Sequence, residues 1–535
     1  MQVATGFEPW LTVGFERRVL VVARTVTTVN RLLDALTLFE NDHRVQVVFT
    51  YNEHRPAILG AGVPALLQRL GVAVVAWERA VGERFDLVIA ASENDDLHLL
   101  GSPVVLLPHG IGFQKYYPGG TVIAGMDPRR LVRDEQVVPA LIAVTHEDQI
   151  HQLRRVSPPA ADRARVVGDP CLDRINAGTH RAGEYREALG AAGRKLVTIA
   201  STWGPASLLG THPRLPLRLV SELPVDEFAV CLVLHPGITA AHGPWQVEAW
   251  LAQARQAGLR VIPPDSGWQT AITAANCVIT DSGSVALYAA SQDLPVLLAE
   301  GEPATLVPGS PAAALAARAP RLTGAEPLPS QLAKVLEGHV AGCHEEVVRR
   351  AVAVPGRSAA LLRAAFYELM GLPEPAGDAE FTSHEPVRPV RTAIAAYVTG
   401  AVAEADSTTL LRFPATDVPH QVDHQHLSAH CTRASLRQLS AAAIVFTDLP
   451  EAEHGRFAEW AADTLRRWPD AHLAAARLPG RCLVRSRDGL IRELTPDDPG
   501  LDPLLAASLP YLGRTAPAEL ITVGARTAKV AIRVH

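Results

Sequence analysis

Short apolar runs alternate with helical patterns through the first third of the chain. The run Val19–Ala23 is followed by apolar residues at helical spacing as far as Phe39, and then by a second run over 45–50. The alternation continues with a helix expected over 66–70 and strands expected over 72–76, 87–90, 104–107 and 141–144. Near-continuous apolar strands separated by helices are typical of a parallel sheet covered on both faces.

A second series of the same kind follows the segment Val166–Pro170. Its expected strands are 196–200, 229–234, 259–262, 277–280 and 296–299. Helical patterns then run over 330–354 and 358–370, and the last of them is expected to close the second unit. We predict an α/β protein with two Rossmann-like parallel-sheet domains, over residues 1–170 and 171–372.

The remaining residues have a different pattern. Residues 373–389 are rich in Pro, acidic and small polar residues without periodicity, which predicts a linker. Residues 390–535 are predicted to form a small accessory α+β domain, for which the sequence indicates no role. Its expected elements are helices over 392–404 and 451–468 and strands over 443–446, 520–523 and 528–534.

Composition limits the partners. The 535 residues carry a formal net charge of -6 at pH 7, so no global positive field attracts nucleic acid, and we expect no such partner. The sequence has neither a signal peptide pattern nor a long apolar run, which favours a cytoplasmic protein. An apolar arm with Phe7, Trp10, Leu11 and Phe15 leaves peripheral membrane contact open, although such arms more often pack on their own protein.

Polar turns that follow apolar strands are candidate sites, because open parallel sheets bind ligands beyond the carboxyl ends of their strands. The strongest such turn is Asp281-Ser282-Gly283-Ser284, which lies between an expected strand and an expected helix. Free backbone N–H groups at the helix start, with the two serine hydroxyls, could seat a diphosphate. A plain helix cap is the alternative, because Asp and Ser commonly take that role.

Three further turns carry candidate chemistry. His235 follows the strand over 229–234 and could donate to a phosphate oxygen or pair with a backbone carbonyl. Ser201-Thr202-Trp203 ends the strand over 196–200 in a polar turn that would face the same cleft. In the first domain, His109 follows a strand and precedes glycines that allow close backbone approach, which suits a general base acting on an acceptor hydroxyl.

Six short motifs follow one another along the chain. They are Pro108-His109-Gly110, the segment 167–173, Ser201-Thr202-Trp203, His235-Pro236, the segment 279–284 and Pro355-Gly356-Arg357-Ser358. In this order they resemble the CDP-glycerol glycerophosphotransferase-like branch of GT-B proteins, over roughly residues 15–370. Pro108, Ile111 and Gly283 depart from the family pattern, which usually has Trp before and Thr after the His-Gly pair and hydroxyl residues throughout an Asp-x-Ser-Ser turn.

The resemblance implies a transferase without a metal ion or other cofactor, acting on a nucleotide-activated donor and a hydroxyl acceptor. His109 would deprotonate the acceptor. The donor phosphates would be held by His235, Ser282, Gly283 and Ser284, with assistance from Thr202. The nucleoside pocket would be lined by Pro264, Asp265 and Ser266. Asp281 is expected to form and cap the turn and not to bind a metal ion.

Histidines and acidic residues also crowd one stretch of the accessory domain. They are Asp417, His420, Asp423, His424, His426 and His430. The pairs His420 and His424, or His426 and His430, would share one face of a helix with a spacing that can bind zinc. A solvated loop is the better interpretation, because Pro419 lies within the stretch and apolar periodicity is absent.

The leading functional hypothesis is transfer of a glycosyl or polyol-phosphate group from a CDP- or UDP-linked donor to a hydroxyl acceptor, in a setting such as cell-surface polymer synthesis. A UDP-sugar 2-epimerase-like enzyme is the first alternative, because an Asp-Ser-Gly turn is similar to the donor corner of such enzymes. It would need carboxylates, for which Glu93, Asp95 and Asp96 are the candidates. A non-catalytic nucleotide- or partner-binding scaffold is the second alternative, and the sequence assigns no oligomeric state.

Overall fold

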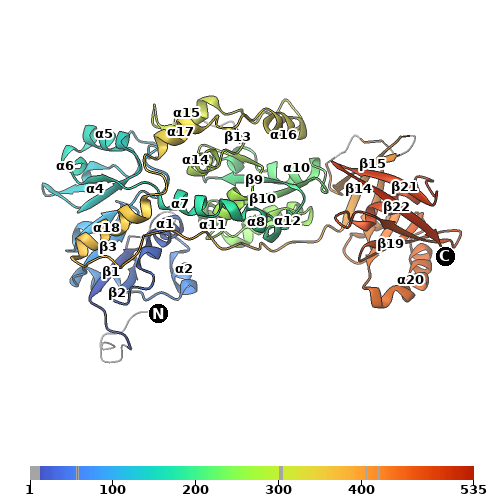
Figure 1. Cartoon of the computed structure of the whole chain (residues 1–535), viewed down its shortest axis with the longest axis horizontal. Coiled ribbons are helices and arrows are strands. Elements are labelled where there is room, and N and C mark those ends of the chain that lie inside the picture. The colour runs from blue at the N-terminus through green and yellow to red at the C-terminus, as the bar shows by residue number, and fades with distance from the viewer. Residues whose placement is uncertain are drawn as a thin grey trace.

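The computed structural model describes residues 12–55, 57, 60–117, 119–299, 305–404, 407–418, 422–423 and 425–535. Three bodies lie in a row in chain order: two domains built on parallel sheets, consistent with the GT-B type, and a barrel (Figure 1). Within the N-terminal arm, Phe7, Trp10 and Leu11 lie outside the described residues, and Phe15 is half-buried. None of the described helices combines the length and apolar character needed to cross a bilayer.

The first sheet has the strand order β2-β1-β3-β4-β7-β8, and all its pairings are parallel. Its strands are β1 (Arg17–Val22), β2 (Val45–Thr50), β3 (Leu87–Ala90), β4 (Val104–Leu106), β7 (Leu141–Val144) and β8 (Ala164–Val166). A short hairpin of β5 (Val132–Arg133) and β6 (Gln136–Val137) lies apart from it. The strand predicted over 72–76 is wrong, because only Val74 bridges to Phe49 of β2.

Helices pack against this sheet. They are α1 (Val26–Leu36), α2 (Val63–Leu70), α3 (Trp77–Gly82), α4 (Pro128–Leu131), α5 (Glu147–Val156) and α6 (Pro158–Ala161). The sequence of α1 explains its formation, because Thr25 and Thr28 form a reciprocal capping box and Leu32 and Ala35 lie on its fully buried apolar face.

Helix α18 (Ser358–Met370) packs on the first domain, although it follows the second domain in sequence (Figure 1). Leu362 and Phe366 lie in the same buried cluster as the residues of β1 and β3, and the ring of Phe366 stacks on Phe39 with centroids 5.5 Å apart. The prediction that this helix closes the second unit is therefore wrong. Its apolar face is buried by the first sheet, so the chain crosses back between the domains.

The second sheet has the strand order β11-β10-β9-β12-β13 and is also parallel. Its strands are β9 (Lys195–Ser201), β10 (Phe228–Leu234), β11 (Arg260–Ile262), β12 (Cys277–Thr280) and β13 (Val296–Leu298). All five overlap the predicted strands, because each is an apolar run buried on both faces.

Eleven helices accompany this sheet in the described part of the chain. They are α7 (Pro170–Ala177), α8 (Ala182–Ala188), α9 (Leu208–Thr211), α10 (Leu215–Glu222), α11 (Pro236–His242), α12 (Pro244–Gln256), α13 (Trp268–Thr273), α14 (Ser284–Ser291), α15 (Pro311–Arg318), α16 (Leu328–Glu337) and α17 (Glu345–Ala351). The single helix predicted over 330–354 is thus two, separated by a loop in which Gly342 has a φ of +80°. A left-handed residue of this kind cannot continue a helix.

Residues 390–535 form a closed barrel, which corrects the predicted small α+β domain. Nine strands of the described residues take part, in the order β14-β15-β21-β22-β20-β19-β18-β17-β16. They are β14 (Ala396–Ala403), β15 (Ser407–Pro414), β16 (His426–His430), β17 (Ile444–Asp448), β18 (Leu473–Leu478), β19 (Arg481–Ser486), β20 (Ile491–Pro496), β21 (Ala518–Val523) and β22 (Arg526–Val534). The helices are α19 (Leu436–Ser440), α20 (Phe457–Arg467) and α21 (Ser508–Tyr511), so the predicted helix over 451–468 is confirmed in its second half.

The helix predicted over 392–404 is wrong, because strand β14 occupies this segment. It pairs with β15 on one edge and β16 on the other. Gly400 packs so closely on Val422 that an added Cβ would lie 2.5 Å from the Val422 side chain. The alanine-rich segment is helical in local preference, and pairing on both edges overrides that preference.

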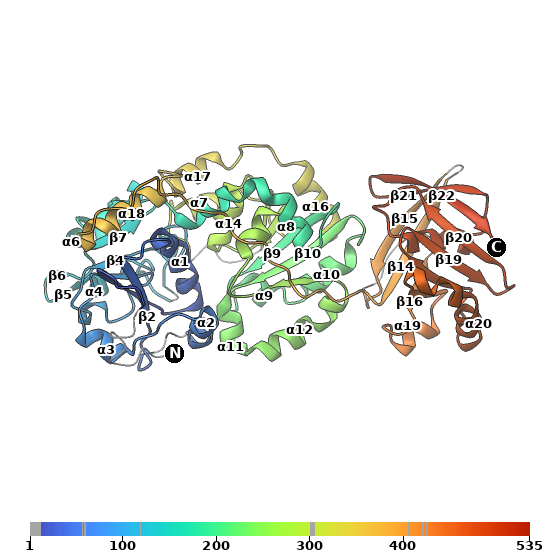
Figure 2. The same cartoon turned by 60° about the horizontal axis from the view of Figure 1, so that its bottom comes forward.

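Residues 373–395, here called the strap, run from α18 along the second domain to the barrel (Figure 2). The Tyr185 hydroxyl donates to the His384 carbonyl at 2.8 Å, and Arg174 Nε donates to the Thr382 carbonyl at 3.1 Å. The segment predicted as a linker is therefore extended and fixed to the surface of the second domain.

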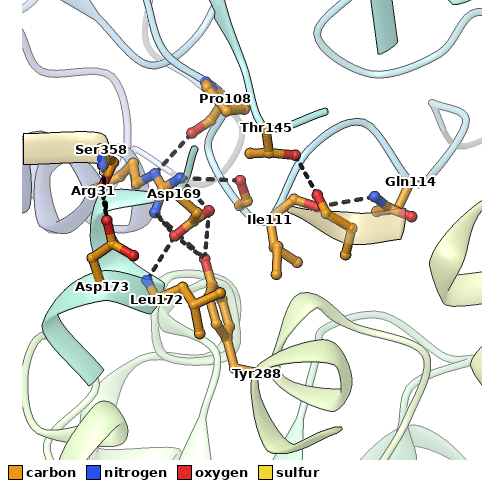
Figure 3. A network of polar contacts seen from close by, with 12 residues as sticks. Arg31, Pro108, Ile111, Gln114, Thr145, Asp169, Leu172, Asp173, Tyr288 and Ser358 are labelled. Atoms are coloured by element: carbon orange, nitrogen blue, oxygen red, sulfur yellow. Dashed lines mark hydrogen bonds and ion pairs between the residues drawn. The ribbon is translucent and has the colours of Figure 1, made fainter. Parts of the chain in front are cut away.

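A buried ion pair joins the two α/β domains (Figure 3). The two terminal nitrogens of Arg31 in α1 donate to the Asp169 carboxylate at 2.9 and 2.6 Å, and both side chains are buried. The Tyr288 hydroxyl of α14 lies 3.3 Å from the same carboxylate. Burial lowers the pKa of Arg31, but the Asp169 carboxylate together with Tyr288 and Cys171 outweighs this effect and raises the pKa well above its ordinary value.

The same crossover segment fixes two helices. Asp169 accepts the backbone N–H of Leu172 at 2.8 Å and so caps α7. Asp173 accepts the N–H groups of Gly356 at 2.6 Å and Ser358 at 2.9 Å, which anchors the start of α18. The arrangement of the two sheets therefore depends on the short segment 169–173.

We predict that Asp169→Asn destabilises the protein by about 3–5 kcal/mol, because it leaves the buried guanidinium of Arg31 without its counter-charge. The free energy of unfolding in urea measures this loss. Glu346→Gln is the control, because Glu346 pairs with Arg318 on the surface, where such pairs contribute about 0–1 kcal/mol. A loss at Asp169 no larger than at Glu346 would contradict the prediction.

Candidate functional site

The candidate site lies where the carboxyl ends of the two sheets meet, here called the junction. The loop after β4 brings His109 and Gly110 to it, and the loop after β12 brings the start of α14. The two loops touch, because a Cβ added to Gly110 would lie 2.5 Å from the Ser284 hydroxyl. The fold thus places the first-domain His-Gly motif against the predicted phosphate-binding turn.

Asp281 holds this turn together. One of its carboxylate oxygens accepts the N–H and the hydroxyl of Thr202, both at 2.8 Å, and the N–H of Leu208 at 3.0 Å. The other oxygen accepts the N–H of Gly283 at 3.2 Å. The buried carboxylate therefore forms the turn, as expected, and ties it to the Thr202 turn at the end of β9.

Gly283 is the N-cap residue of α14 and offers no side-chain hydrogen bond to the first helical turn. The N–H groups of that turn therefore lack a side-chain cap and point to where an anion could lie. An added Cβ at Gly283 would lie 2.6 Å from the Thr202 methyl group. This close approach to Thr202 explains why position 283 holds a glycine and not the hydroxyl residue of the family pattern. Ser282 and Ser284 are half-buried beside it.

His235 lies at the same junction and caps α11. Its Nδ1 accepts the N–H of Gly237 at 2.9 Å, and its Nε2 lies 3.3 Å from the Thr27 hydroxyl of the first domain. Desolvation, with repulsion from His109 and Lys115, lowers the pKa of His235 to about 4. The ring is therefore neutral at pH 7 and can donate through Nε2–H. The sequence did not predict the contact between His235 and Thr27.

His109 is exposed to solvent at the junction, and the protein on both sides still desolvates its ring. This desolvation lowers the pKa of His109; the charge of Glu93 opposes the shift, and Arg31 and Lys115 add to it. A neutral, accessible imidazole can accept a proton from a hydroxyl group.

Lys115 is the site residue to which sequence reasoning gave no role. It follows His109 by six positions and forms an isolated backbone bridge with Leu306 of the second domain. Desolvation lowers the pKa of its ammonium group, and the Asp281 carboxylate opposes this shift. The charge of Lys115 thus acts on both His109 and His235 at the junction, and the glycine-rich run before Lys115 was the available signal.

The carboxylates that an epimerase would need are already engaged. Glu93 accepts the Tyr117 hydroxyl at 2.6 Å and the Gly125 N–H at 2.8 Å. Asp95 pairs with Arg24 at 2.6 Å, and Asp96 pairs with Arg55 at 2.7 Å.

The loop predicted to line the nucleoside pocket lies at the rim of the junction. Pro264 and Asp265 are half-buried, and Ser266 is exposed. The Asp265 carboxylate pairs with Arg69 of α2 in the first domain. The loop therefore lies between the domains, where its contact with a nucleoside stays a prediction.

A cavity of about 460 Å³ opens at the carboxyl ends of β1 and β2. Arg24, Tyr51, Asn52 and Asp95 contribute polar groups to its wall. It adjoins the junction, because Thr27 lies three residues beyond Arg24 and contacts His235.

The histidines of the accessory region do not gather at a metal site in the described residues. His420 and His424 lie outside those residues. His426 and His430 lie on strand β16, where both are buried. His426 Nε2 lies 3.0 Å from the Ser508 hydroxyl, and His430 Nε2 lies 3.5 Å from the Asp448 carboxylate.

Another group has the composition of a metal site in the described part of the chain. His339, Cys343 and His344 bring three ligand atoms within 4.8 Å of one another, in the loop between α16 and α17. Among the free cysteines, Cys171, Cys231, Cys277 and Cys482 are buried, whereas Cys343 is exposed.

No protein-family model matches the chain, and no curated protein matches it in sequence. Solved structures resemble it in fold. The wall teichoic acid polymerase TagF is 13% identical with a TM-score of 0.44, over 66% of this chain and 89% of that chain. The UDP-GlcNAc 2-epimerase from Neisseria meningitidis bound to UDP-GlcNAc is 13% identical with a TM-score of 0.40, over 66% and 99%.

A third similar structure is Anabaena HepE in complex with UDP-glucose. It is 15% identical with a TM-score of 0.35, over 66% of this chain and 95% of that chain. The solved structures that the chain is similar to in fold thus include TagF and two proteins in complex with UDP-sugars.

The lowered pKa of His235 predicts acid sensitivity. An unfolded histidine binds its proton near pH 6.5, whereas folded His235 stays neutral down to about pH 4. Stability is therefore lost as the pH falls through this window, by up to about 2 kcal/mol between pH 7 and pH 5. We expect His235→Asn to lose less stability than the wild type over that interval in urea unfolding. The exposed His151→Asn serves as control, and equal losses in wild type and His235→Asn would refute the prediction.

Proposed function

We propose that the protein transfers a glycosyl or polyol-phosphate group from a CDP- or UDP-linked donor to a hydroxyl acceptor. The observation that carries the proposal is the contact of the His109-Gly110 loop with the uncapped start of α14, where His235 also reaches across to Thr27 of the first domain. A nucleoside diphosphate carries the charge that such a set of donors attracts.

On the donor side, the diphosphate would lie against the first turn of α14. The N–H groups of Ser284 and the residue after it, with the Ser282 and Ser284 hydroxyls, would contact it there, because no side chain caps this helix start. The lowered pKa values of His235 and Lys115 support the assignment, because they reflect desolvated basic groups that an anion would stabilise. Pro264, Asp265 and Ser266 would contact the nucleoside from the rim.

On the acceptor side, the cavity of the first domain would position a hydroxyl group, and His109 would take its proton. The acceptor oxygen would attack either the anomeric carbon of a glycosyl group or the phosphorus of a polyol-phosphate group. The bond from that atom to the donor's phosphate oxygen breaks in the same step. The product nucleotide is a diphosphate in the first case and a monophosphate in the second.

Charge that develops on the leaving nucleotide requires stabilisation from groups fixed beforehand. The Lys115 ammonium, the Nε2–H of His235 and the amides of the α14 start would provide it without a metal ion. Thr202, which Asp281 fixes, would assist them. An epimerase gains less support from this arrangement, because Glu93, Asp95 and Asp96 already have partners.

The test combines binding with turnover. Full-length protein is incubated with CDP- and UDP-linked donors, and thermal stabilisation and nucleotide release are measured with and without hydroxyl acceptors. We expect one donor class to stabilise the protein and to release its nucleotide. Lys115→Met should weaken donor binding about tenfold or more, whereas Lys529→Met on the barrel should not. His109→Ala should keep donor binding and lose about 100-fold or more in turnover.

Three outcomes separate the alternatives. Donor binding without any turnover would replace the transferase proposal by the scaffold. Inversion at C2 of a UDP-sugar without nucleotide release would replace it by the epimerase. Turnover that His109→Ala leaves unchanged would remove the proposed base.

A further inference from the structure

A second cavity, of about 550 Å³, lies between the second α/β domain and the barrel. On the domain side it is lined by residues at the amino ends of β9, β10 and β11, and on the barrel side by residues of β14, β15 and β18. The barrel adjoins the second domain on the side away from the first (Figure 2). The cavity is therefore at the sheet edge opposite the junction.

The cavity wall is strongly basic. It contains seven arginines but only two carboxylates, Asp226 and Asp502. Both carboxylates are already used by Arg412, at 2.6 and 2.7 Å, and Asp502 also pairs with Arg477. Three more of the arginines have acidic partners, because Arg433 and Arg477 contact Asp448 and Arg526 contacts Asp498.

Three arginines remain without a carboxylate within ion-pair distance among the described residues: Arg194, Arg260 and Arg391. Two of them share one backbone acceptor, because Arg194 and Arg260 both donate to the Gly190 carbonyl, and Arg391 packs on the same glycine. Gly190 has a φ of +64°, so both its conformation and its missing side chain make room for this group.

Two of the three side chains, Arg194 and Arg260, are in an environment that disfavours their charges. Arg260 is 8% exposed, and its buried Nε has no hydrogen-bond partner in the described part of the chain. Desolvation and the charges of Arg194 and Arg391 lower the pKa of Arg260 to about 10, and desolvation likewise lowers that of Arg194. The guanidinium groups of Arg194 and Arg260 have backbone carbonyl acceptors but no carboxylate partner among the residues described, so a bound anion would stabilise their charges.

We propose that this cavity binds a phosphate-bearing anion through the cluster of Arg194, Arg260 and Arg391. Guanidinium groups recognise phosphate oxygens with charge-assisted, often bidentate hydrogen bonds. The cavity volume accommodates a small phosphorylated metabolite or a diphosphate. Because Arg391 belongs to the strap, the bound anion would also fix the strap between the second domain and the barrel.

The site is separate from the junction. The cluster is at the amino end of β9, next to Lys195, and Thr202 of the junction follows the carboxyl end of the same strand at Ser201. A strand of seven residues spans roughly 20 Å. One small anion therefore cannot occupy both sites, and the two can be tested independently.

Inorganic pyrophosphate is the probe, titrated into the full-length protein by calorimetry. The measurements are made in the Lys115→Met background, which weakens the contribution of the junction. We expect saturable binding that falls with added NaCl and that Arg391→Gln weakens about tenfold. Arg391→Lys, which keeps the charge but not the guanidinium fork, should bind with an affinity between those of the Lys115→Met protein and its Arg391→Gln variant. Arg388→Gln is the matched control, because Arg388 is exposed on the same strap and does not line the cavity.

The proposal is overturned if Lys115→Met protein binds no pyrophosphate, or if Arg391→Gln and Arg388→Gln bind it equally. Arg391 is exposed, so its replacement should leave the fold intact, and the melting temperature without ligand checks this. Neither outcome depends on whether the junction has transferase activity.

A second, independent site is formed by His339, Cys343 and His344. The Nε2 atom of His344 lies 3.1 Å from the Leu294 carbonyl, and the Nε2 atom of His339 lies 3.4 Å from the Asp293 carboxylate. His339 Nδ1 lies 3.8 Å from Cys343 Sγ. The His344 ring thus has one nitrogen oriented by a backbone oxygen and the other available, as in metal-binding histidines. The buried Nε2 of His339 has no hydrogen-bond partner among the described residues.

We infer that these three side chains bind Zn²⁺, with a water molecule or exogenous ligand as the fourth donor. One thiolate and two imidazoles form a ligand set that zinc prefers, at distances of about 2.0–2.3 Å. The protein is loaded with ZnCl2, passed over a desalting column and analysed for metal. We expect about one equivalent in the wild type and in Cys431→Ser, and a loss in Cys343→Ser and His344→Ala. Less than a tenth of an equivalent in the wild type would refute the inference.

Discussion

The relative position of the two α/β domains depends on the buried pair of Arg31 and Asp169. One residue comes from the first helix and the other from the crossover between the domains, and the Tyr288 hydroxyl of α14 completes the contact. A buried guanidinium is costly unless its partner is held in the correct geometry. The pair therefore permits one arrangement of the two sheets. Arg31 Nε also donates to the carbonyl of Pro108, which precedes His109 in the same loop.

The junction that results is built by backbone proximity as much as by side chains. Gly110 lies against Ser284, and Gly283 lies against Thr202, with no room for a further carbon atom at either position. Such approaches place amide groups where a phosphate can reach them. Asp281 fixes the 281–284 turn through hydrogen bonds inside the protein. His235 and Lys115 lie at the same junction. Packing at the junction desolvates the side chains of His235 and Lys115, which destabilises their charged forms. A bound anion would offset this destabilisation.

Both ends of the strands in the second sheet lie next to another part of the chain. Its strand carboxyl ends face the first domain, and its amino ends face the barrel, where Arg412 contacts Asp226 and a group of arginines lacks acidic partners. The strap connects the first domain to the barrel along the surface of the second domain. Anion binding at the barrel edge would therefore act on the element that connects all three bodies.

The sequence by itself determined the two parallel sheets, because strands such as β1, β10 and β12 are apolar runs buried on both faces, and this pattern is local. It also determined the turns that end those strands, including 281–284. Only the tertiary structure decided the rest. Helix α18 buries its apolar face against the first domain, and β14 is a strand because it pairs on both edges. Nine strands of the described residues form a closed barrel. Lys115 and the uncompensated arginines became recognisable through neighbours distant in sequence. Local sequence preference determines whether a segment can form a helix or a strand. The burial of a side chain and the charges around it depend on contacts between segments that are distant in sequence.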